Sequence, residues 1–81
     1  MITGEQIRMS RAGLRLSVRA LAKIAGVSAM TITRLENERS GGYAETLRKI
    51  QKALEAEGIE FLDGDAPGIR LRRAPKRKPR R

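Results

Sequence analysis

The sequence predicts a mainly α-helical fold that ends in a small β-hairpin. Apolar residues recur at helical spacing through most of the chain, and capping residues or glycines divide them into short segments. Two strand-like segments, Ile59 to Leu62 and Ile69 to Arg72, follow the last helical stretch and flank a turn that contains Pro67 and Gly68. We therefore expect four or five helices followed by two antiparallel strands.

The composition excludes most catalytic chemistry. A chain of 81 residues holds one small domain, and this chain contains no cysteine and no histidine. Thiolate nucleophiles, imidazole bases and the common zinc sites are therefore ruled out, and we expect no cofactor, no metal ion and no enzymatic activity. The first residues lack the pattern of a secretory signal, and no apolar run approaches the roughly 20 residues of a membrane span, so we expect a cytoplasmic protein without a membrane partner.

The net charge of +9 is unevenly distributed along the chain. The segment from Arg70 onward carries eight of the 18 basic residues and no acidic residue, which leaves residues 1–69 almost neutral. Within that neutral part, residues 7–39 carry a net charge of +5 and residues 44–65 a net charge of −3. This polarity suits a domain with one face toward phosphates and the other end toward a different partner, such as a second subunit.

The first helix is predicted to begin at a capping box. In residues 3–6 (Thr-Gly-Glu-Gln) the threonine oxygen closes the first turn and the glutamine reaches back to the cap nitrogen. Ile7 and Leu14 are seven residues apart and so lie on one face of this helix. Gly13 is expected to end the helix before a connector at Arg15 and Leu16.

Two short helices joined by a glycine turn are predicted next. Ser17 caps the first of them, and Gly26 permits the left-handed backbone that a sharp turn needs. Val27 then faces the core, and Ser28 caps the second helix, which runs to about Asn37. The first helix of the pair buries one face formed by Val18, Leu21, Ala22 and Ala25, and the second helix buries Ile32 and Leu35.

A fourth helix and the hairpin complete the predicted order. Residues 44–57 form an amphipathic pattern that Gly58 ends, and the inward residues of this pattern are Leu47, Ile50 and Leu54. An isolated hairpin is marginal in water, so the two strands should pack on the helices or pair with another chain, with Phe61 as the apolar anchor.

The chain therefore divides into three parts. Residues 1–58 form a helical domain, residues 59–72 form the hairpin and residues 73–81 form a basic tail. The tail has no apolar periodicity, repels itself and contains two prolines, so we expect it to be disordered in the free protein.

Residues 17–37 closely resemble the DNA-binding core of the Cro and phage-repressor family, also called the XRE family. The resemblance rests on Leu-Ala in the first helix of the pair, Gly-Val-Ser in the turn, two apolar residues three apart in the second helix, and Leu-Glu-Asn at its end. It extends over about residues 5–56. It implies a helix-turn-helix domain, in which the second helix projects from the body so that its outer residues enter the major groove of DNA.

The resemblance also implies roles for individual residues. The base-reading positions are occupied by Ala29, Met30, Thr33 and Arg34, which the second helix is expected to expose. The positions that contact the DNA backbone are occupied by Ser17, Arg19, Ser28, Thr31, Asn37 and Arg39. Arg11 and Glu36 match a pair that forms a structural salt bridge in the family. Two positions depart from the pattern, because Val18 stands where many members carry a glutamine and Glu38 stands where a glycine often ends the helix.

These features predict a small transcriptional regulator that binds double-stranded DNA sequence-specifically. A single recognition helix reads only a few base pairs, so we expect a nucleoid-associated homodimer on an inverted-repeat operator. The expected dimer interface is the acidic end of the fourth helix together with the hairpin, and the alternative is the fourth helix alone. The interface residues to test are Ile59, Phe61, Ile69 and Leu71. RNA polymerase or another protein is a further candidate partner, and the sequence does not choose between repression and activation.

Two other functions fit the same fold. One is a protein-interaction module, an antitoxin or anti-activator whose partner docks on the hairpin or the tail. The other is an architectural or excision factor of a mobile element, which uses the basic tail to bend DNA. Removal of Arg34 should abolish operator recognition in a regulator and leave partner binding intact in an interaction module.

Overall fold

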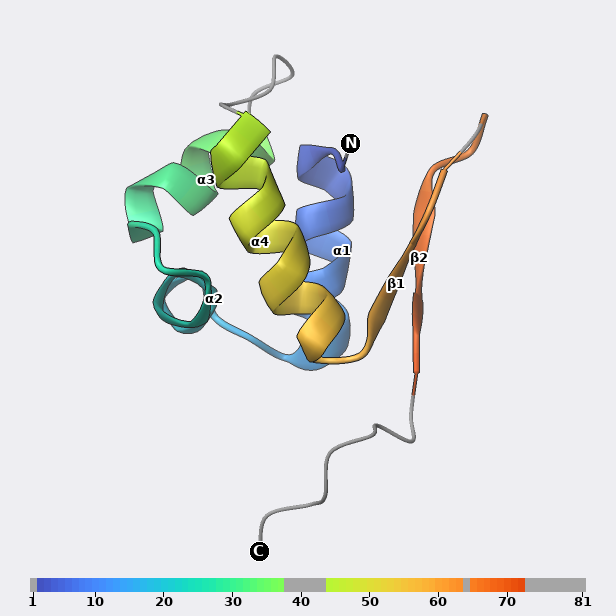
Figure 1. Cartoon of the computed structure of the whole chain (residues 1–81), viewed down its shortest axis with the longest axis horizontal. Helices are drawn as coiled ribbons and strands as arrows, with labels where there is room; N and C mark the ends of the chain where they lie inside the picture. Colours follow the sequence, from blue (N-terminus) through green and yellow to red (C-terminus); the bar gives the residue numbers. More distant parts are fainter. Residues whose placement is uncertain (1, 38–43, 64, 73–81) are drawn as a thin grey trace, which may run out of the picture.

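The computed structural model describes residues 2–37, 44–63 and 65–72, and it confirms the predicted mainly helical fold with a C-terminal hairpin (Figure 1). The elements are α1 (Gly4–Leu14), α2 (Val18–Ala25), α3 (Ala29–Asn37), α4 (Ala44–Ala56), β1 (Ile59–Leu62) and β2 (Gly68–Leu71). The predictions made for Glu38, Arg39 and the basic tail lie outside the described residues. In the described ranges, no helix is long and apolar enough to span a membrane.

The first helix begins as predicted and ends later than predicted. The backbone amide of Gln6 donates to Thr3 Oγ1 at 3.2 Å, and the amide of Thr3 donates to Gln6 Oε1 at 2.9 Å. The prediction that Gly13 ends α1 is wrong, because the closing residue is Arg15, which adopts the left-handed conformation at φ 59°. The helix continues through Leu14 because that side chain packs against the core, and the amide of Leu16 then bonds back to the carbonyl oxygen of Arg11 at 2.9 Å.

The turn between α2 and α3 follows the local rules of capping. Ser17 Oγ accepts a hydrogen bond from the amide of Ala20 at 3.0 Å at the start of α2. Gly26 ends α2 in the left-handed conformation at φ 73°, which glycine adopts without steric cost. Ser28 Oγ accepts from the amide of Thr31 at 3.1 Å, so this serine caps α3. The two helices therefore meet at a short turn of defined geometry.

The hydrophobic core lies where the four helices converge. Its fully buried side chains include Ile7 of α1, Leu21 of α2, Ile32 of α3 and two residues of α4, Ile50 and Leu54. Burial of each such side chain contributes about 2 kcal/mol to stability. The apolar faces predicted for the four helices are therefore the faces that pack together, and α3 is held on the body by Ile32 together with Leu35.

The hairpin packs on the helices of its own chain. Ile59 of β1 pairs with Leu71 of β2, and Phe61 pairs with Ile69, in an antiparallel register. Gly58, at φ 105°, ends the preceding segment and connects it to β1. Figure 1 shows the hairpin beside α1, on the side of that helix away from α2 and α3.

The four residues predicted for the dimer interface differ in how far the single chain buries them. Ile59, Phe61, Ile69 and Leu71 share one face of the two-stranded sheet, since they alternate along the strands and pair with one another. Ile59 is 3% exposed within the single chain, and Phe61 and Ile69 pack against the same core. Within the single chain, Ile59 is thus buried, Phe61 and Ile69 are partly buried, and Leu71, at 42% exposure, is the exposed member of this set.

Candidate nucleic-acid interface

The third helix presents an accessible face on a firmly anchored base. Ile32 and Leu35 are 0% and 6% exposed and fix α3 to the body. The opposite surface of α3 carries Met30, which is 69% exposed, and the exposed side chains of Thr33 and Arg34. An exposed methionine next to an arginine, on a helix whose other face is buried, is a surface able to make apolar and charged contacts with a partner.

Ala29 differs from the other residues predicted to read bases. Its side chain is partly buried and packs against the core, so α3 exposes it only in part. The reason is geometric, because Ala29 precedes Ile32 by three residues and therefore shares its face of the helix. Met30, Thr33 and Arg34 then form the outward face of α3 in the described structure.

The hydroxyl-bearing residues predicted to contact the DNA backbone lie at the beginnings of α2 and α3. Ser17 uses its side-chain oxygen to cap α2, while the oxygens of Ser28 and Thr31 lie 2.9 Å apart and share a hydrogen bond. Ser17 and Ser28 are exposed, Thr31 is partly exposed, and the side chain of Arg19 is exposed on the first turn of α2. These polar groups therefore lie at the N-terminal ends of α2 and α3, where backbone amides favour an anion.

Val18 stands where many family members carry a glutamine, and its surroundings account for the difference. Its side chain is partly buried and packs against the core. At this position the chain gains apolar contact and has no side-chain amide to donate to a phosphate.

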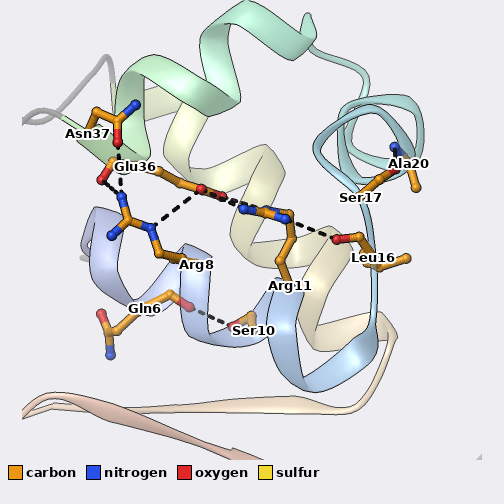
Figure 2. Close-up of polar contacts among 9 residues, drawn as sticks. All are labelled: Gln6, Arg8, Ser10, Arg11, Leu16, Ser17, Ala20, Glu36 and Asn37. Atoms are coloured by element: carbon orange, nitrogen blue, oxygen red, sulfur yellow. Dashed lines mark hydrogen bonds and ion pairs between the residues drawn. The ribbon is translucent and has the colours of Figure 1, made fainter.

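A salt bridge ties α1 to the end of α3. Nε and Nη2 of Arg11 donate to the two carboxylate oxygens of Glu36, each at 2.8 Å, and Nη1 donates to the carbonyl oxygen of Leu16 at 3.2 Å (Figure 2). The side chain of Glu36 is 5% exposed, so its charge is shielded from water. The hydrogen bond to Glu36 raises the pKa of the Arg11 guanidinium, against the opposing effect of burial. The two-bond geometry holds α3 at a defined angle on α1.

Arg8 joins the same cluster, which the sequence did not indicate. Its Nη2 donates to the carbonyl oxygen of Glu36 at 2.8 Å and to Asn37 Oδ1 at 3.0 Å, while its Nε lies 3.7 Å from the Glu36 carboxylate (Figure 2). The available signal was the spacing, because Arg8 precedes Arg11 by three residues and so lies on the same face of α1. The last turn of α3 is therefore bound by two arginines from one helix.

Close backbone contact also fixes the position of α3. A Cβ atom on Gly4 would collide with the carbonyl oxygen of Leu35 and would lie 3.2 Å from the Cα atom of Glu36. A residue without a side chain is thus required where the start of α1 meets the last turn of α3.

Comparison with known proteins identifies this arrangement. No protein-family model matches the chain. The chain is 37% identical over 75 residues to the HTH-type transcriptional repressor RghR of Bacillus subtilis (strain 168), and this match covers 89% of the chain and 56% of that repressor. It is 30% identical over 79 residues to the repressor protein C2 of Salmonella phage P22, with 98% of the chain and 37% of that repressor covered. The chain thus spans about half the length of the relatives it matches, or less.

The chain carries a helix-turn-helix domain that is similar to those of the Cro and phage-repressor family. In this helix-turn-helix domain, α2 and α3 are the helix pair and α3 occupies the place of the recognition helix. Glu36 is the sole acidic residue of these two helices, and its carboxylate is buried against Arg11. The charged side chains that the helix pair exposes are consequently all basic, namely those of Arg19, Lys23 and Arg34.

Proposed function

We propose that this chain binds double-stranded DNA sequence-specifically, as a homodimer on an inverted-repeat operator, and thereby regulates transcription. The observation that carries the proposal is the outward face of α3, where Met30, Thr33 and Arg34 project from a helix anchored by buried residues. A helix held in this way enters a major groove without reorganisation of the domain. The two relatives are named as repressors, which supports the same function.

Each outward residue suits a different base contact. The guanidinium of Arg34 donates two hydrogen bonds to the major-groove edge of a guanine. The exposed side chain of Met30 makes apolar contact with a thymine methyl group, and the hydroxyl of Thr33 bonds to either kind of base edge. Ala29 is partly buried and so offers less apolar surface to the groove than Met30 does.

Backbone contacts place this helix in register. We assign them to Ser28, Thr31 and Arg19, with the first turn of α2 after Ser17 offering its backbone amides to a phosphate. Asn37 serves the same purpose at the other end of α3. Contacts of this kind set the orientation of the protein, and they leave the choice of sequence to the residues in the groove.

A twofold dimer is required by the small number of bases that one helix reads. Two copies with half-sites about one helical turn apart, roughly 34 Å, give a usable site length. We assign recognition to residues 1–58, contact between subunits to the accessible surface of residues 59–72, and additional phosphate contacts to the basic sequence of residues 73–81. Leu71 is an exposed large apolar residue of the hairpin and so offers apolar contact to a second subunit.

The deciding experiment is selection of bound duplexes from a random DNA pool with the full chain at about 0.15 M salt, where nonspecific binding is suppressed. A recurrent inverted repeat is the expected result. The matched variants are Arg34→Ala on α3 and Arg48→Ala, which removes an exposed arginine from α4. Arg34→Ala should relax the preference at one position of each half-site, and Arg48→Ala should leave the selected motif unchanged. Recovery of no motif by the unaltered chain would contradict the proposal and favour a protein-interaction module.

A further inference from the structure

We propose that Arg8 and Asn37 together form a binding point for one phosphate of the DNA backbone, in which Arg8 supplies the charge and fixes the side-chain amide of Asn37. The inference rests on the proposed function, because the phosphate belongs to the bound duplex. It extends the DNA-contacting surface from the helix pair onto α1, which no motif in the sequence assigns to DNA.

The side chains of Arg8 and Asn37 come together from two different helices. Arg8 lies on α1 and Asn37 is the last residue of α3, and 29 positions separate them in the sequence. Arg8 Nη2 bridges the carbonyl oxygen of Glu36 at 2.8 Å and Asn37 Oδ1 at 3.0 Å (Figure 2). Both hydrogens of this nitrogen are therefore committed, and the plane of the guanidinium is set by two acceptors.

The contact with Arg8 sets the orientation of the Asn37 side-chain amide. A guanidinium has donors alone, so the amide of Asn37 must present its oxygen to Arg8. Its NH₂ group is thereby directed away from Arg8, and within the described ranges it has no acceptor at hydrogen-bond distance. Without Arg8, the amide is free to rotate and either of its ends faces the solvent.

Arg8 also retains hydrogen-bond donors that its contacts with Glu36 and Asn37 leave unused. Its Nε faces the carboxylate of Glu36 at 3.7 Å, and its Nη1 meets no acceptor among the described residues. The side chain is 52% exposed, so Nη1 is open to a ligand. Nη1 of Arg8 and the NH₂ group of Asn37 are thus both left without an acceptor among the described residues at the end of α3, and a phosphate oxygen accepts such bonds strongly.

The local charge at the C-terminal end of α3 is favourable for an anion. The C-terminal end of a helix repels an anion because its last carbonyl oxygens carry partial negative charge. Here one of these oxygens, that of Glu36, is occupied by Arg8, and the Glu36 carboxylate is occupied by Arg11. Two guanidinium groups face one carboxylate, which leaves a net charge of +1 at a helix end that is otherwise unfavourable for phosphate.

The test is a double-mutant cycle on DNA affinity, measured with the full chain by fluorescence anisotropy against salt concentration. The variants are Arg8→Met, Arg8→Lys, Asn37→Ala and the combination Arg8→Met with Asn37→Ala. Arg48→Met is the matched control, since Arg48 is an exposed arginine of α4 that lies outside the surfaces assigned to DNA and to the second subunit. Thermal unfolding verifies that each variant is folded at the measuring temperature.

The expected results distinguish the charge that Arg8 supplies from its role in positioning the Asn37 amide. Arg8→Met should weaken binding to all duplexes by about tenfold and reduce the slope of log affinity against log salt by about one. Arg8→Lys should keep the slope and still lose affinity, because a lysine does not bridge two acceptors as a guanidinium does. In the Asn37→Ala background, Arg8→Met should cost clearly less than it does alone.

Two results would overturn the inference. One is a loss of affinity and slope for Arg8→Met no larger than for Arg48→Met, and the other is strict additivity of the Arg8 and Asn37 substitutions. If the unaltered chain binds no duplex DNA, the proposed function itself fails, which is a distinct outcome. If Arg8→Met does not fold, the same comparison is made with Arg8→Lys, where retention of full affinity contradicts the proposal.

Discussion

The side-chain nitrogen of Gln6 donates a hydrogen bond to the carbonyl oxygen of Gly68 at 2.9 Å and so joins α1 to a strand 62 positions later. The same nitrogen donates to the carbonyl oxygen of Leu62 at 3.0 Å, while Oε1 of this side chain accepts from the amide of Thr3. Gln6 is 2% exposed, so these bonds are shielded from water. One side chain therefore caps the first helix and holds the turn end of the hairpin.

We expect Gln6→Leu to loosen the hairpin. The substitution removes the hydrogen bonds to both strands and one half of the capping box, which should reduce the free energy of unfolding by about 2 kcal/mol. Amide hydrogen exchange in β1 and β2 should accelerate. Gln51→Leu is the control, because Gln51 donates to Glu55 on an exposed face of α4, and it should change stability by less than about 0.5 kcal/mol. Equal hairpin protection in the two variants would contradict this role of Gln6.

Two glycines of α1 should respond to alanine with opposite signs. Gly4→Ala places a Cβ atom against the backbone of Leu35, which has no room to yield, and should destabilise the protein by about 2 kcal/mol. A Cβ atom on Gly13 would lie 3.9 Å from Cδ2 of Leu71, an ordinary contact inside a helix, so Gly13→Ala should stabilise by about 0.5 kcal/mol. Urea unfolding measures both. A neutral Gly4→Ala would refute the close approach of α1 to α3.

Substitution of Arg11 should lower the stability of the protein more than substitution of Glu36, its partner in the salt bridge between α1 and α3. Arg11→Met leaves the carboxylate of Glu36 buried without its two strong donors and should reduce stability by about 3 kcal/mol. Glu36→Gln keeps an oxygen for Arg11 to bond and should reduce it by about 1 kcal/mol. Denaturant unfolding of the two variants at neutral pH provides the comparison, and a larger loss for Glu36→Gln would contradict the arrangement.

Phe61→Asp distinguishes a core residue from an interface residue. Because Phe61 packs against its own helices, the aspartate should destabilise the single chain by about 3 kcal/mol. The loss should be the same at low and high protein concentration. An interface role would instead make the loss depend on concentration, as sedimentation and urea unfolding at two concentrations would reveal.

Arg34→Ala should weaken binding to the selected DNA site by about 1 to 3 kcal/mol, with relaxed preference at one base position. Stability should change little, because the side chain is exposed and no bond from it to another described residue is present. Titration of the variant with the selected site and with variants of that site gives the answer. An equal loss on the site and on random DNA would assign Arg34 to the backbone.

Much of the helix-turn-helix domain could be predicted from the sequence because the signals are local. Ser17, Gly26 and Ser28 act on amides or dihedral angles within four residues, so their roles follow from capping and turn chemistry. The buried faces of the helices follow from periodicity in the same way, and with them the exposure of Met30 and Arg34.

The tertiary structure decided what depends on distant segments. Arg15 rather than Gly13 ends α1, because Leu14 reaches the core. The sequence left open whether the hairpin packs on its own helices or pairs with another chain, and the structure shows Ile59, Phe61 and Ile69 packed in or against the core of the same chain. Arg8 and Gln6 acquire their partners from residues 28 to 62 positions away, and local propensity carries no information about such pairs. The sequence by itself determined which short segments form helices, turns and strands, whereas their packing determined which polar side chains meet and which apolar face remains for a partner.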